Sequence, residues 1–363
     1  MPFREKASES SENIGIGFDI IDACNIRCRQ CFYSKNEQSA NLISLEQMTE
    51  IVKKASGKFS EMYVLGGEPT LHPQLAEILK LGLEHFKTVI LVTNGLRFAD
   101  EDYCKKIALP NLSISMHRRA ISPAAKELVS DLSQHRNYFD QSERAWKNVE
   151  KFWQGDVNVQ INLLKPLVDD GHALDIFKWS RSKGYEPIIE LTKPGPIFER
   201  GHVLDVSQEE IKKLFEEMQA YDNEYFPKWA AKMLVPPSYG HNCTMSETGI
   251  HVTVDGSVIP CVAHTTLVLG NILTDDIDEM LASPIRESIK DYQNWIVGPC
   301  RECHIFEYCH GGCRGEAFWD TGCPRASDPY CWHIPSGLTL KDMAPQSCEG
   351  CILENHPGCA KKV

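Results

Sequence analysis

Short apolar runs alternate with amphipathic helical patterns through the first half of the chain. Two segments, 44–55 and 73–86, have helical spacing, and Ser44 with Gln47 predicts a capping box at the start of the first. Strands that alternate with helices imply right-handed βαβ units and a parallel sheet. Six units fall short of the eight in a closed barrel, so the pattern predicts an α/β fold with a partial (β/α)6 TIM-like barrel over residues 1–194. The predicted strands are 15–20, 62–65, 88–93, 112–115, 157–164 and 187–191.

The second half of the chain contains segments of different composition. Residues 195–239 are charged and helical, end in a Pro-Pro turn, and are predicted to form a helical bridge. Residues 240–335 combine many turn residues with little periodicity, and 336–363 form a cysteine-containing tail. Such segments usually take their stability from bound metal rather than from an apolar core, so we expect a small cysteine-rich α+β domain after the barrel.

Cysteine is the anomaly in the composition, with 15 in 363 residues. The polar N-terminus has no apolar segment typical of a secretory signal, and no run approaches the ~18 apolar residues that cross a membrane. We therefore expect a reducing cytoplasm, in which so many cysteines indicate metal ligands rather than disulfides. The net charge of −12 argues against non-specific nucleic-acid binding, which depends on neutralising phosphates.

Three cysteines directly follow the first predicted strand. Cys24, Cys28 and Cys31 have the spacing CxxxCxxC. Three thiolates on one tight loop suit three irons of a [4Fe–4S] cluster and leave the fourth iron open, as in a catalytic metal site. A zinc-binding loop is the alternative from spacing alone. The position at the end of a barrel strand favours the catalytic interpretation.

With this loop the chain resembles the radical S-adenosylmethionine (SAM) superfamily. Gly66-Gly67-Glu68-Pro69 follows the second predicted strand and is similar to the family's GGEP motif, whose backbone and Glu bind the amino group of SAM. Gln30 departs from the family, which usually has an aromatic residue before the third cysteine. The resemblance also implies candidate contacts to SAM at Asn94, Ser115, His117 and Asn162, with His117 in place of the family's acid. Arg144 is a further candidate, as a bidentate fork for the SAM carboxylate, and an exposed helical arginine without a role is the alternative.

The resemblance implies a specific chemistry. SAM would bind the open iron, and an electron from the reduced cluster would cleave it to methionine and a 5′-deoxyadenosyl radical, which removes a hydrogen atom from the substrate. The protein's task is to exclude water and to position one C–H bond. The resemblance also implies an external one-electron donor such as flavodoxin or ferredoxin. Several polar groups near the barrel mouth are candidates for a substrate base, and the sequence singles out none of them.

Seven further cysteines form a second pattern, Cx12Gx4C followed by Cx2Cx5Cx3C and a last cysteine. This pattern resembles the SPASM domain, which binds auxiliary iron–sulfur clusters behind the barrel in many peptide-modifying enzymes. The resemblance implies two auxiliary [4Fe–4S] clusters, a distal one and an inner one nearer the barrel. Their ligands would be Cys300, Cys303, Cys309 and Cys331 for the distal cluster, and Cys243, Cys261 and Cys313 for the inner cluster.

The inner cluster lacks one ligand. Fully ligated relatives have another cysteine shortly before the first, but this chain has none between Cys104 and Cys243. Either one iron stays open and binds substrate, or a residue such as His241 or a later cysteine fills the position.

The remaining cysteines divide into one isolated residue and one group. Cys104 lies in a helical stretch and is expected to be an ordinary buried thiol. Cys348, Cys351 and Cys359 have the spacing Cx2Cx7C, and with Cys323 they would supply four thiolates for a third auxiliary cluster or a zinc ion. Alternatively, one of these four completes the inner cluster.

Three classes of function follow. The first is modification of a peptide or protein side chain. The second is the same chemistry on a small molecule, such as a tetrapyrrole side chain, an aminoglycoside or another sugar. Only about fourteen residues precede the first strand, fewer than the leader-binding module of many peptide maturases needs, which lowers the leader-guided reading of the first class. The third is a non-catalytic iron–sulfur electron carrier, which the pairing of GGEP with CxxxCxxC disfavours.

Overall fold

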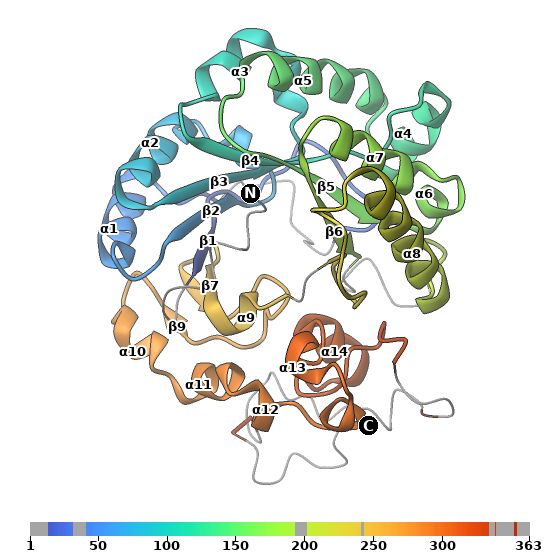
Figure 1. Cartoon of the computed structure of the whole chain (residues 1–363). Coiled ribbons are helices and arrows are strands. Elements are labelled where there is room, and N and C mark those ends of the chain that lie inside the picture. Colours follow the sequence, from blue (N-terminus) through green and yellow to red (C-terminus); the bar gives the residue numbers. More distant parts are fainter. Residues whose placement is uncertain are drawn as a thin grey trace.

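One mixed sheet organises the chain in the computed structural model, which describes residues 14–31, 41–192, 202–240, 243–333, 338 and 352–353. Its strand order is β6-β5-β4-β3-β2-β1-β7-β8-β9. The strands from β1 to β6 pair in parallel and curve into an open barrel wall (Figure 1), so the predicted partial barrel is confirmed. The strands are β1 (Gly15–Asp19), β2 (Glu61–Leu65), β3 (Thr88–Thr93), β4 (Leu112–His117), β5 (Val157–Leu163), β6 (Glu186–Leu191), β7 (Gly249–Val252), β8 (Ser257–Ile259) and β9 (Gly270–Asn271).

Helices cover the outer face of this wall (Figure 1). The predicted capping box is present at the start of α1, where the side chains of Ser44 and Gln47 bond to each other's backbone N–H groups. None of the described helices combines the length and the apolarity needed to cross a membrane. The helices of this half are α1 (Leu45–Ala55), α2 (Leu75–His85), α3 (Glu101–Ile107), α4 (Lys126–Ser133), α5 (Tyr138–Phe152), α6 (Lys165–Asp169), α7 (His172–Ser182) and α8 (Gln208–Tyr225), with short 3-10 turns at Pro69–Leu71, Leu96–Ala99 and Pro123–Ala125.

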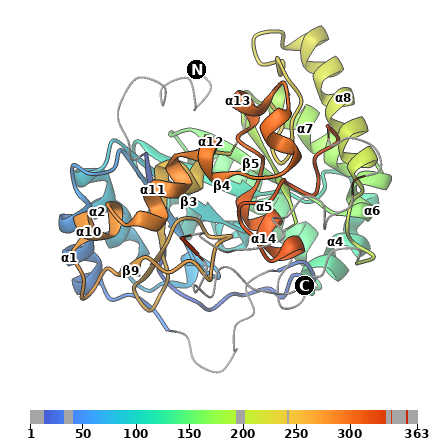
Figure 2. The same cartoon turned by 90° about the horizontal axis from the view of Figure 1, so that it is seen from below.

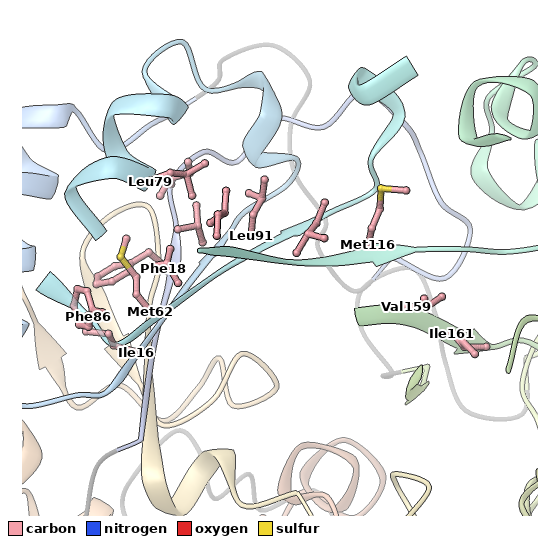
Figure 3. Packing of buried hydrophobic residues seen from close by; sticks show 14 of the residues in the cluster. Ile16, Phe18, Met62, Leu79, Phe86, Leu91, Met116, Val159 and Ile161 are labelled. Atoms are coloured by element: carbon pink, nitrogen blue, oxygen red, sulfur yellow. The ribbon is translucent and has the colours of Figure 1, made fainter. Parts of the chain in front are cut away.

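The main core fills the space between the sheet and these helices (Figure 3). Phe18 of β1, Met62 of β2 and Leu91 of β3 are fully buried, and Leu79 of α2 packs onto them. Every residue of β1 is buried, as expected for a central parallel strand that is covered on both faces. This packing fixes the C-terminal ends of the strands, where the functional groups lie.

The C-terminal half begins as a continuation of the barrel sheet. Strand β7 pairs in parallel with β1, and β8 and β9 follow in antiparallel order. At the junction His251 Nε2 lies 3.1 Å from Asp19 Oδ1, and both residues are buried. Gly17 leaves room for this pair, because a Cβ there would come within 2.6 Å of the His251 ring.

Small helices then lie across the open side of the barrel, as the view from below shows (Figure 2). Helix α8 lies within the predicted bridge segment, and buried Arg181 of α7 holds it through hydrogen bonds to buried Asp222. The predicted domain boundaries at 194, 239 and 335 stay predictions. The C-terminal helices are α9 (Met245–Thr248), α10 (Ile277–Leu281), α11 (Pro284–Lys290), α12 (Tyr292–Trp295), α13 (Phe306–Cys309) and α14 (Arg314–Thr321), with a 3-10 turn at Pro299–Glu302.

A candidate active site lined by two sets of cysteines

A cavity of about 400 Å³ lies between the C-terminal ends of the barrel strands and the cysteine-rich half. Cys24, Cys28 and Cys31 line it from the loop after β1. The Cys31 N–H donates to the Cys28 carbonyl over 3.1 Å, which closes the turn between these two ligand candidates. Burial raises the pKa of the Cys24 thiol to about 12, so at neutral pH a bound cation such as iron is needed to hold it as a thiolate.

The glycines of the GGEP segment lock it against the cysteine loop. The N–H of Gly67 donates to the Ile21 carbonyl and the N–H of Glu68 to the Ala23 carbonyl, both over 2.8 Å. A Cβ on Gly66 would lie 2.3 Å from the Ile21 oxygen, and one on Gly67 would lie 2.4 Å from the Ala23 oxygen. Only glycine allows the two backbones to approach so closely.

Glu68 is buried and already bonded within the protein. Its Oε1 accepts hydrogen bonds from the Thr70 N–H (3.0 Å), the Thr70 hydroxyl (2.6 Å) and the Thr93 hydroxyl (2.6 Å). Its Oε2 accepts one from the Asn94 N–H over 2.8 Å. Burial raises the pKa of Glu68, while these bonds favour the carboxylate. The side chain therefore ties the end of β2 to the end of β3, and its contact with SAM stays a prediction.

The other predicted contact residues divide between the cavity and its surroundings. Asn94 lines the cavity and supports the cysteine loop, because its Nδ2 donates to Asn25 Oδ1 over 2.8 Å. His117 and Asn162 also line it, at the ends of β4 and β5. Burial, and then the charge of Arg119, lower the pKa of His117 to about 3, so its imidazole is neutral. Ser115 is buried in β4 and is not among the residues that line the cavity.

Arg144 as a ligand of the SAM carboxylate stays a prediction, and its position fits the alternative of an ordinary surface arginine. Arg144 is exposed on α5 and does not line the cavity, whereas Arg119 enters the cavity and is 4 % exposed. Arg119 Nη2 donates to Cys28 Sγ over 3.1 Å. With the Gln30 amide oxygen turned toward it, both guanidinium η-nitrogens also donate to Gln30, over 2.8 and 2.7 Å. Among the residues that line the cavity in the described ranges, Arg119 is the one permanent cation.

The three cysteines assigned to the inner auxiliary cluster face the same cavity. Cys243, Cys261 and Cys313 line it on the side of the C-terminal half. Pro237 and Ser238, from the end of the predicted bridge, complete this part of the lining. The fold therefore brings two sets of cysteines, more than 200 residues apart in sequence, to the wall of one cavity.

The four cysteines assigned to the distal cluster are neighbours of one another. Cys300 interacts electrostatically with Cys303, Cys309 and Cys331, and Cys309 also interacts with Cys331. Burial raises the pKa of Cys309 to about 12 and also raises the pKa of Cys331. Three buried thiols and the half-buried thiol of Cys303 in one place fit a cluster whose irons each take one thiolate.

The candidates for a third metal site are only partly described. Cys323 is buried beside Ala317 and Ala326, and Cys348, Cys351, Cys359 and His241 lie outside the described residues. Cys104 is buried in the main core, as expected. All the described cysteines are free thiols. Within the described ranges, no three His, Cys, Asp or Glu side chains gather closely enough to share a single metal ion.

Comparison with known families finds a match in each half of the chain. Residues 19–170 match the radical SAM superfamily, and residues 243–304 match the SPASM iron–sulfur cluster-binding domain. The chain is therefore a radical SAM enzyme that carries a SPASM domain. Membership in these families implies a [4Fe–4S] cluster with SAM and auxiliary iron–sulfur clusters.

Relatives and solved structures extend this likeness over most of the chain. Mycofactocin maturase MftC of Mycolicibacterium smegmatis is 24 % identical over 347 residues, covering 89 % of this chain and 84 % of MftC. AdoMet-dependent heme synthase of Methanosarcina barkeri is 23 % identical over 348 residues, covering 88 % of this chain and 96 % of the synthase. The structure of anSMEcpe with bound AdoMet and the Cp18Cys peptide superposes with a TM-score of 0.69 at 20 % identity, covering 88 % of this chain and 94 % of that one.

Proposed function

We propose that this enzyme modifies a side chain of a peptide or protein by removing a hydrogen atom from it. The observation that carries the proposal is the single cavity lined by both sets of cysteines, because a substrate held there would lie between the SAM site and the inner auxiliary cluster. The peptide class is supported by the relative named as a maturase and by the similar fold that was solved with a bound peptide.

The residues present fit the proposed cofactors. Cys24, Cys28 and Cys31 offer three thiols from one loop, which would leave one iron of a [4Fe–4S] cluster open for SAM. The cavity volume of about 400 Å³ falls in the usual range for small-molecule sites, roughly 300–1,000 Å³. When bound and reduced, the cluster supplies one electron to SAM, and the cleaved SAM supplies the radical that takes the hydrogen atom.

The chain's own residues would orient the bound molecules and keep water out. The backbone of Gly66–Glu68 is held rigidly beside the cysteine loop, and Arg119 would pair with the SAM carboxylate. Neutral His117 and the Asn162–Glu190 pair, joined by a hydrogen bond of 3.1 Å, supply further polar groups to the cavity. Apolar lining from Val92, Ile189 and other strand residues excludes water from the reacting atoms.

Arg119 and Arg144 can be separated by experiment. Arg119→Gln should weaken SAM binding roughly 10- to 100-fold, because a charge-assisted hydrogen bond contributes about 1.5–3 kcal/mol. It should also make the reduction potential of the SAM-binding cluster more negative, because a buried positive charge beside a cluster ligand favours the reduced state. Equilibrium SAM binding and an EPR-monitored redox titration measure both effects. Arg144→Gln is the matched control and should change neither quantity; weaker binding in this variant alone would restore the sequence-based expectation.

The substrate class is tested by mass spectrometry under anaerobic conditions. The reconstituted enzyme is given SAM, a chemical reductant and deuterated candidate peptides encoded beside its gene. Deuterium in 5′-deoxyadenosine together with a mass change in the peptide would support the proposal. We propose flavodoxin or ferredoxin as the natural electron donor and a reducing cytoplasm as the place of reaction.

A small-molecule substrate is the second candidate. It is favoured by the relative named as an AdoMet-dependent heme synthase, which matches over 96 % of its own length. A tetrapyrrole with deuterated side chains is the corresponding probe, and an aminoglycoside or another sugar is tested in the same way. Deuterium transfer from such a compound, with none from the peptides, would replace the first proposal by this one.

We also propose that the tail cysteines bind additional metal, as a third auxiliary cluster or zinc. The double variant Cys348→Ala/Cys351→Ala should then contain fewer iron or zinc ions per chain than the wild type. Plasma emission spectrometry measures both metals, and Cys104→Ala is the control because Cys104 is buried in the main core. Unchanged iron and zinc in the double variant would exclude this proposal.

A further inference from the structure

The inner auxiliary cluster has three cysteine candidates for four irons. Cys243, Cys261 and Cys313 line the cavity, and no upstream cysteine is close in sequence to supply the fourth thiolate. Each iron of a fully ligated [4Fe–4S] cluster takes one protein ligand. The fourth iron therefore either stays open or takes a donor of another type.

His264 is the fourth residue of a tight turn that begins at Cys261. Its backbone N–H donates to the Cys261 carbonyl over 2.8 Å, which closes a turn of the form Cys-x-x-His. The same backbone bond joins Cys31 to Cys28 over 3.1 Å and Cys303 to Cys300 over 3.0 Å. In both of those turns the first and fourth residues are the predicted cluster ligands. His264 thus occupies the place that a second cysteine has in the other two turns.

The side chain of His264 is buried without a hydrogen bond to any residue that the structure describes. The residue is 1 % exposed, and neither Nδ1 nor Nε2 has a hydrogen-bond partner among the described residues. An unsatisfied buried polar group costs roughly 1–3 kcal/mol, so native proteins rarely retain one without a reason. A neutral imidazole with a free nitrogen is also the form in which histidine binds metals.

The surroundings place His264 near two of the inner-cluster candidates, Cys261 and Cys313. Ala263 packs against the start of α14, where a Cβ on Gly315 would lie 2.3 Å from the Ala263 Cβ. Arg314, which directly follows Cys313, is close enough to act electrostatically on the His264 ring. The turn at Cys261 and the segment at Cys313 therefore meet next to this histidine.

We propose that His264 is the fourth protein ligand of the inner auxiliary cluster. This inference rests on the assignment of Cys243, Cys261 and Cys313 to that cluster. With His264 bound, all four irons have protein ligands, and the cluster does not bind substrate directly. A neutral imidazole in place of a thiolate also raises the reduction potential of a cluster, as it does in Rieske centres.

Histidine labelling tests the ligand directly. The full chain is produced with either natural or ¹⁵N-labelled histidine, reconstituted anaerobically, reduced without SAM, and examined by electron–nuclear double resonance. We expect a strongly coupled ¹⁴N signal on an auxiliary cluster that changes to ¹⁵N with the label. Full iron content without any histidine coupling in the wild type would overturn the proposal, and this result needs no variant to fold.

Three variants complete the test. His264→Ala and His264→Cys should both lose the nitrogen coupling, and His264→Cys should keep the iron content and lower the reduction potential of the inner cluster. His85→Ala is the matched control, because His85 lies on α2 of the barrel and should leave the coupling unchanged. Coupling that persists in His264→Ala would overturn the proposal. Unchanged iron content in Cys261→Ala would instead show that the cluster assignment itself is wrong.

Discussion

Replacement of Cys28 by alanine is expected to reduce SAM cleavage to background. Cys28 is the middle ligand candidate of the loop, and its sulfur also accepts the hydrogen bond from Arg119. Without it, two thiolates remain for a cluster that needs three, so the iron that would bind SAM is lost with the cluster. Anaerobic assays of 5′-deoxyadenosine, iron content per chain, and the EPR signal of the reduced cluster measure the effect.

Cys104→Ala is the matched control for this loss. Cys104 is also a buried thiol, but it packs in the main core on α3, away from the cavity. We expect the free energy of unfolding to fall by about 1 kcal/mol, which is typical when a small core side chain is shortened. SAM cleavage should be retained. Cleavage that survives in Cys28→Ala at the control's level would contradict the assignment of the loop to the SAM-binding cluster.

The barrel was predictable because its signals are local. Each parallel strand is a short apolar run between polar turns, and all six predicted runs became strands that begin or end within two residues of the expectation. The capping box at Ser44 depends on two residues three positions apart. The pairing of β7 with β1 was not predictable, because it depends on Gly17 leaving space for His251, more than 200 residues away.

The cysteines of the site could be predicted because their spacing in the sequence indicates metal binding. The arginine of the site could not, because the sequence does not show the direction of a side chain. The cysteine motifs predict which thiols share a cluster, and the structure brings the three loop cysteines and three of the later cysteines to one cavity. Arg118 and Arg119 are adjacent and chemically identical, so only the fold distinguishes them. Arg118 turns to Glu143 and to the face of Trp179, whereas Arg119 enters the cavity. The two adjacent arginines directly after the fourth strand were the sequence signal that could have indicated a cation in the cavity other than Arg144.

Gly67→Ala should disable the site without removing a ligand. The added Cβ would lie 2.4 Å from the Ala23 carbonyl oxygen and 2.6 Å from that of Asp22. Both are backbone atoms that cannot rotate away, so the segment leading into the cysteine loop must move. A displacement of about 1 Å at a reacting centre can cost roughly 100-fold in rate, and we expect at least that loss in SAM cleavage together with weaker SAM binding.

Gly57→Ala separates this local effect from general destabilisation. Gly57 has φ +77°, and a Cβ there meets no atom within 4 Å, so the substitution strains the backbone by about 1–2 kcal/mol without a steric clash. It lies after α1, outside the cavity lining, and should retain SAM binding and cleavage. Thermal unfolding and iron content are measured for both variants. If Gly67→Ala bound SAM as tightly as Gly57→Ala, the close contact between the GGEP segment and the cysteine loop would not be what shapes the SAM site.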